Sequence, residues 1–82
     1  PDPKTGGERY VPAEVLIRLD KTLDPARFRE LLGTIQGTVL EENAQQGLYR
    51  VKVPEGTDIP SLVRRINGME KISAEPNYVY RA

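Results

Sequence analysis

The first regular pattern along the chain is an alternation of apolar and polar residues over EVLIRLD, residues 14–20. A two-residue period is typical of a strand with one buried face. We therefore predict a first strand here. Its buried set is Val15, Ile17 and Leu19, and its other set is Glu14, Leu16, Arg18 and Asp20.

A helical period follows and begins at Asp24-Pro25. The aspartate can accept a hydrogen bond from an unpaired backbone N–H, and proline at the first helical position loses none. We predict that Gly37 closes this helix in a left-handed conformation. The apolar stripe of ARFRELLGTIQG consists of Phe28, Leu31, Leu32 and Ile35.

Residues 38–42 and 48–53 are predicted to be two strands of a hairpin. The polar connection 43–47 ends in glycine and has a length that suits such a turn. In the second strand, Tyr49, Val51 and Val53 share one face, whereas Leu48, Arg50 and Lys52 share the other.

A second helix is predicted after this hairpin, capped by Asp58 or Thr57 and ended by Gly68. Its apolar stripe is Leu62, Val63, Ile66 and Met69. The last segment, residues 71–82, is predicted to be extended. Because proline has no N–H to donate, Pro76 is expected only at the edge of a sheet or after strand pairing has stopped.

The resulting order, β-α-β-β-α-β, predicts an α+β, ferredoxin-like fold with two helices on one face of a four-stranded antiparallel sheet. The opposite face would be bare, and a partly apolar bare face usually docks a partner. We expect it to carry Leu16, Arg18, Leu48, Arg50 and one of Val39 or Leu40.

The fold is predicted to occupy residues 13–77. Residues 1–12 hold three of the seven prolines and two adjacent glycines, which favours a flexible leader. Residues 78–82 are predicted to be an extended tail. Because the chain starts without methionine or an apolar signal segment, we expect it to be part of a longer protein.

Composition narrows the function classes. A chain of 82 residues buries only about 60% of its unfolded surface, so the core is thin. The 12 basic residues are scattered among 12 acidic ones, which argues against a nucleic-acid partner. No apolar stretch of roughly 20 residues is present, so no membrane partner is expected and the domain should be soluble.

The residues offer little for catalysis. Cysteine and histidine are absent, which removes thiol nucleophiles, imidazole bases, disulfides and nearly all zinc sites. No histidine can activate Ser61 or Ser73, so the chain is predicted not to be an enzyme. Neighbouring residues Glu41 and Glu42 point to opposite faces of a strand and are expected to be solvated.

We expect no cofactor, because no glycine-rich phosphate loop follows a strand. RNA-binding modules share this topology, yet the third strand carries a single aromatic residue, Tyr49, for base stacking. Tyr78-Val79-Tyr80 can either finish the last strand and cover an edge, or form an extended arm that a protease cleft binds by strand addition.

The segment 74–80, AEPNYVY, together with GLYRVKVPEG at 47–56 and a helix ending near residues 68–70, resembles the propeptides of subtilisin-like serine proteases. It is most similar to versions from thermophilic bacteria, and the likeness runs from Tyr10 to Ala82. The resemblance implies a secreted protease precursor. In it the module acts as an intramolecular chaperone and a temporary inhibitor of its cognate protease, and it is a monomer when isolated.

The resemblance also implies site residues. The open face would pack on two parallel surface helices of the protease. Glu75 and Asn77 match acidic positions that cap the N-termini of these helices, where unpaired N–H groups carry partial positive charge. Asn77 departs from the more usual aspartate and keeps an acceptor oxygen without the charge. The tail in the substrate cleft would be Tyr78, Val79, Tyr80, Arg81 and Ala82, with Tyr80 near the fourth subsite and Ala82 near the junction.

Two alternatives remain open. The first is a free-standing subtilisin inhibitor that is never joined to its target. It would be distinguished by a gene that does not continue into a protease domain. The second is a small-molecule-binding regulatory module of the ACT kind, which usually pairs its sheets into dimers and would be stabilised by its ligand.

Overall fold

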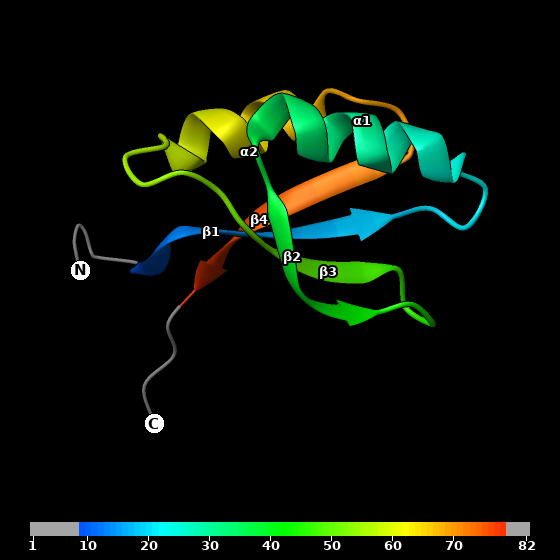
Figure 1. Ribbon diagram of the computed structural model, residues 1–82, viewed down its shortest axis with the longest axis horizontal. Coiled ribbons are helices and arrows are strands. Elements are labelled where there is room, and N and C mark those ends of the chain that lie inside the picture. Colours follow the sequence, from blue (N-terminus) through cyan, green and yellow to red (C-terminus); the bar gives the residue numbers. More distant parts are fainter. Residues whose placement is uncertain (1–8, 79–82) are drawn as a thin grey trace.

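The computed structural model describes residues 9–78 and confirms the predicted ferredoxin-like order β-α-β-β-α-β. The four strands form one antiparallel sheet in the order β2-β3-β1-β4, and both helices lie on the same side of it (Figure 1). The elements are β1 Tyr10–Leu19, α1 Pro25–Ile35, β2 Thr38–Asn43, β3 Leu48–Lys52, α2 Ile59–Asn67 and β4 Ile72–Tyr78. No helix in this part of the chain is long and apolar enough to cross a membrane.

The core lies between the two helices and one face of the sheet. Val15, Ile17 and Val51 point from the two central strands toward the helices and are completely buried, as the alternation predicted. The helices contribute Phe28, Leu31, Ile35, Ile59, Leu62 and Ile66. Every buried side chain within residues 9–78 is hydrophobic, so the core is a single apolar layer.

Both predicted helix caps are present. The Asp24 carboxylate accepts a hydrogen bond from the backbone N–H of Ala26 at 3.0 Å, and Pro25 opens α1. The Asp58 carboxylate, rather than Thr57, accepts one from the backbone N–H of Ser61 at 3.1 Å and begins α2. These bonds satisfy N–H groups that the first turn of a helix leaves unpaired.

The end of α1 differs from the prediction. The left-handed residue is Gln36, with φ 56°, and not Gly37. Glycine is required at position 37 because the chain passes close to β3 there. A Cβ on Gly37 would lie 2.8 Å from Val51 Cγ1, which is closer than real carbon atoms approach.

The first strand begins earlier than predicted. It starts at Tyr10 rather than at residue 14, so residues 10–12 belong to the sheet and not to a leader. The pairing between β1 and β4 is interrupted after Tyr10 and resumes at Val15, and Ala13 in this bulge has φ 60°. Pro12 is exposed within the same interruption, where a missing N–H breaks no ladder bond.

The second helix also departs from its predicted stripe. Met69 lies beyond the end of α2 and is 40% exposed, because the helix ends at Asn67 and Gly68 follows as its cap. Ile59 is the first residue of α2 and is buried, although the predicted stripe did not include it. Val63 is half-buried and packs against the core.

The strand β4 is an edge of the sheet, which is one of the two positions that Pro76 allowed. Its outward side is partly covered by Asn67 from the end of α2. The Asn67 amide donates to Ala74 O at 3.0 Å and its oxygen accepts from Ala74 N at 2.7 Å. Both main-chain groups of Ala74 bond to Asn67, so they face away from β1. Main-chain groups two residues apart on a strand point the same way, so the N–H that Pro76 lacks would also face away from β1.

The open face of the sheet, a candidate protein-binding site

The face of the sheet away from the helices, here called the open face, brings most of the predicted site residues together. Leu16 in β1 lies opposite Arg50 in β3 on one side and opposite Glu75 in β4 on the other. Arg18 lies likewise between Leu48 and Ser73. Leu16, Leu48, Arg50 and Glu75, predicted from the sequence as partner-binding residues, therefore share one surface.

The apolar part of this face is formed by Leu16 and Leu48, both half-buried in the free domain. They line a hollow of about 610 Å³ together with Arg50, Asn77 and residues 41–45 of the β2–β3 hairpin. A smaller hollow of about 120 Å³ joins the same two leucines to Arg18 and Glu75. The open face is thus an uneven surface with an apolar centre and a charged rim.

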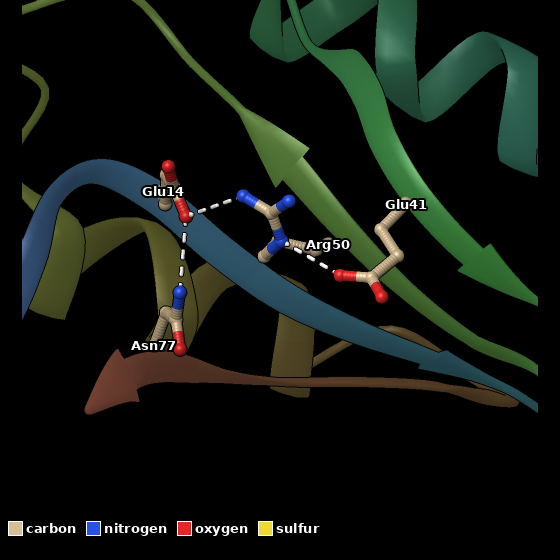
Figure 2. A network of polar contacts seen from close by, with 4 residues as sticks. All are labelled: Glu14, Glu41, Arg50 and Asn77. Atoms are coloured by element: carbon tan, nitrogen blue, oxygen red, sulfur yellow. Dashed lines mark hydrogen bonds and ion pairs between the residues drawn. The ribbon is translucent and has the colours of Figure 1, made fainter. Parts of the chain in front are cut away.

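A chain of polar contacts crosses all four strands on this face (Figure 2). Arg50 of β3 donates from Nε to Glu41 Oε1 of β2 at 3.1 Å and from Nη1 to Glu14 Oε1 of β1 at 3.2 Å. The amide Nδ2 of Asn77 in β4 donates to the same Glu14 oxygen at 3.0 Å. Glu14 is therefore the shared acceptor between Arg50 and Asn77.

The charges in this network are unequally exposed. The side chains of Glu14, Arg50 and Glu41 are 18%, 34% and 72% exposed, so water screens the outer pair most. Hydrogen bonds to Glu14, and then to Glu41, raise the pKa of Arg50 above its already high value. The guanidinium remains charged, and the network mainly fixes the directions of the side chains.

Sequence reasoning missed two members of this network. Glu14 was placed on the same face as Leu16 but was not named as a site residue, although that alternation was the available signal. Glu41 is exposed to solvent as expected, and in addition it pairs with Arg50, which was not predicted. Glu41 and Glu42 do lie opposite different partners, Arg50 and Tyr49, as neighbouring strand residues should.

The remaining predictions for this region have mixed outcomes. Val39 packs against the core, while Leu40, at an interruption in the β2–β3 pairing, is 42% exposed. Tyr49 lies on the helix side of the sheet, with its ring centroid 4.7 Å from that of Phe28. It is therefore not available on the open face, where base stacking by an RNA-binding module would take place.

The predicted tail begins inside the sheet. Tyr78 is the last residue of β4 and lies opposite Tyr10 in the register with β1. Val79, Tyr80, Arg81 and Ala82 lie outside the described residues. Within residues 9–78, no group of three or more acidic side chains gathers in a way that could hold a metal ion.

This fold, with one face covered by helices and the other carrying an apolar centre and a polar rim, defines the chain as a small ferredoxin-like α+β domain with a surface available to a partner. A sequence model of the fervidolysin N-terminal prodomain family matches residues 1–77. The chain belongs to this family and is a propeptide of a subtilisin-like protease. Membership implies association with a subtilisin-like protease domain. No curated protein and no solved structure matches the chain.

Proposed function

We propose that this prodomain binds its cognate subtilisin-like protease through the open face, assists the folding of the protease and inhibits it temporarily. The observation that carries the proposal is the open face itself. Leu16 and Leu48 stay half-exposed in the free domain, although Val15, Ile17 and Val51 on the other face of the same strands are fully buried. Burying such a surface against a partner is favourable, at about 25 cal/mol for each Å² of apolar area.

Glu75 and Asn77 extend this surface along β4. Both lie on the open face, two residues apart on one strand, so their side chains point the same way. We propose that they accept hydrogen bonds from the unpaired N–H groups at the starts of two protease helices. A carboxylate is favoured there by the partial positive charge of a helix start, and an amide oxygen serves as a neutral acceptor.

The inhibitory segment in this proposal is Tyr78, Val79, Tyr80, Arg81 and Ala82. It continues from β4, and an extended segment can be added as a strand to the edge of a substrate cleft. The tail would then be held as a slowly cut substrate. Once it is cut, the small core of the domain favours local opening and degradation, which ends the inhibition.

The chaperone role follows from the same docking. A large α/β protease core depends on parallel strand pairs that are distant in sequence and therefore slow to form. A preformed surface that binds two of the protease helices lowers the entropic cost of bringing them together. In this proposal the domain acts within a secreted precursor, before the mature protease is released.

The test is to mix the chain with the mature subtilisin-like protease of its own precursor and to measure inhibition and the refolding rate of the denatured protease. The wild-type chain should inhibit the protease and accelerate its refolding. Leu48→Glu should weaken inhibition by about tenfold or more, because it buries a charge without a partner.

Met69→Glu is the matched control, since it makes the same chemical change at an exposed apolar residue beyond α2. It should leave inhibition unchanged. Absence of both inhibition and faster refolding with the wild-type chain would refute the proposed function. Equal losses in the two variants would show that the open face is not the docking surface.

A further inference from the structure

We infer that Glu14 is a positioning residue that turns the Asn77 amide so that its oxygen faces the protease, and that Glu14 is the reason why position 77 carries asparagine. The inference rests on the proposed function, because it assumes that the open face docks the protease. The role of Glu14 is inferred from the free domain, in which Asn77 Nδ2 donates a hydrogen bond to Glu14 Oε1 at 3.0 Å.

The direction of the Asn77 side chain follows from the chemistry of its neighbour. An ionised carboxylate can only accept hydrogen bonds, so the amide of Asn77 must turn its nitrogen toward Glu14. The planar amide then places Oδ1 on the opposite side, as Figure 2 shows. No donor within residues 9–78 bonds to this oxygen, which leaves it as an acceptor for an N–H of the partner.

Glu14 is itself held in place. Its Oε1 also accepts from Arg50 Nη1 at 3.2 Å, and its side chain is the least exposed of the charged groups in the network, at 18%. It directly follows Ala13, whose φ of 60° marks the bulge between β1 and β4. Bulges often redirect a neighbouring side chain, and this one allows β1 and β4 to bring Glu14 and Asn77 together.

The same geometry explains the absence of a charge at position 77. Glu14 and Glu41 already place two carboxylates around the single guanidinium of Arg50. An aspartate at position 77 would bring a third carboxylate within about 3 Å of Glu14, where like charges repel. Its oxygens would be displaced from the position that Asn77 Oδ1 occupies.

The test is a double-substitution cycle on the whole 82-residue chain, measured as inhibition of the mature protease of its own precursor. Asn77→Asp should weaken inhibition by about tenfold. Glu14→Gln should weaken it by about threefold, because glutamine presents either a donor or an acceptor and no longer fixes the amide. Glu14→Gln combined with Asn77→Asp should inhibit at least as well as wild type, since the introduced glutamine can then donate to the introduced aspartate.

Asn77→Ala keeps the test decisive if the aspartate variant does not fold. It should weaken inhibition by about tenfold, and adding Glu14→Gln should change little further, because no amide is left to orient. Melting temperatures of all variants separate weak binding from unfolding. The inference would be overturned if wild type inhibits and Asn77→Asp does so equally well, or if the double variant shows no recovery.

A spectroscopic measurement separates this inference from the proposed function. In NMR spectra of the isolated chain, Glu14→Gln should move the side-chain amide signals of Asn77, because Nδ2 no longer donates to a carboxylate. Met69→Glu should leave these signals in place. If Glu14→Gln leaves the Asn77 signals unchanged, Glu14 does not orient Asn77. If the signals move and the wild-type chain does not inhibit the protease, the proposed function fails, and the assignment of the oxygen to the protease fails with it.

Discussion

The need for glycine at position 37 comes from the neighbouring side chains and not from the backbone angles of Gly37. The residue that takes the left-handed conformation at the end of α1 is Gln36, and Gly37 instead lets the chain pass over Val51. Sequence alone suggested the opposite, since glycine is the usual left-handed residue at a helix end. The residue type at position 37 is determined by packing against β3, and a local sequence pattern does not show such packing.

Gly37→Ala is therefore expected to destabilise the domain by about 1–3 kcal/mol. The new methyl group would lie 2.8 Å from Val51 Cγ1 and 3.2 Å from Ile35 Cγ1, so the core must shift to admit it. Chemical denaturation monitored by circular dichroism measures the change.

Gly33→Ala is the matched control for this substitution. A Cβ at position 33 meets nothing within 4 Å, and alanine favours a helix over glycine by about 1 kcal/mol. Its free energy of unfolding should stay equal or rise. A stable Gly37→Ala variant would show that β3 and α1 can separate at no cost.

The sequence predicted individual residues well where the deciding interaction is local. Asp24 was identified as a cap, and Asp58 as one of two candidates with Thr57, because a cap needs only the next three residues of the chain. The bond from Asn77 to Glu14 links positions 63 residues apart, across a bulge. Its register depends on where the bulge falls, so no local pattern could have placed these two side chains together.

At the scale of elements, α2 and β4 are tied by one side chain. Asn67 makes two hydrogen bonds to the main chain of Ala74, at 3.0 and 2.7 Å, and so imitates one residue of a neighbouring strand. This contact fixes the turn between the helix and the strand that carries Glu75 and Asn77. The sequence predicted both elements, the helix from its cap and apolar stripe and the strand as an extended segment, while the contact that orients one against the other was not predicted.

Asn67→Ala is expected to lower the free energy of unfolding by about 1–2 kcal/mol, since two exposed hydrogen bonds are lost. Asn67→Asp should have a similar effect, because it turns a carboxylate oxygen toward Ala74 O. Thermal unfolding and amide hydrogen exchange at Ala74 measure both changes.

Asn43→Ala serves as the control, because the Asn43 side chain accepts a single bond of 3.3 Å in the hairpin turn. Asn43→Ala should lower the free energy of unfolding by less than about 0.5 kcal/mol. Unchanged exchange at Ala74 in Asn67→Ala would show that the two bonds do not form in solution.

At the scale of the whole molecule, a thin core on one side of the sheet sets the stability. The layer architecture was predictable, since each element has one apolar stripe and these stripes can be buried together only in this arrangement. A domain of 82 residues is stable by about 4–12 kcal/mol in total. The open face adds little to this sum until a partner covers it.

Ile66→Ala should therefore lower the free energy of unfolding by about 2–5 kcal/mol, a large part of this total, because Ile66 is completely buried on the inner side of α2. Val63→Ala, on the same helix but half-buried, should cost about 1 kcal/mol or less. Urea denaturation measures both. An Ile66→Ala variant with the wild-type free energy of unfolding would show that the core is not the main source of stability.

The covered outer side of β4 has a consequence for how copies of the chain behave at high concentration. Fibril growth needs a strand whose outward amides are free to pair with the next chain. On β4, the amide of Ala74 is occupied by Asn67 and Pro76 has none to offer, so this strand is a poor template. The other edge of the described sheet is β2, where the adjacent carboxylates of Glu41 and Glu42 disfavour stacking of copies.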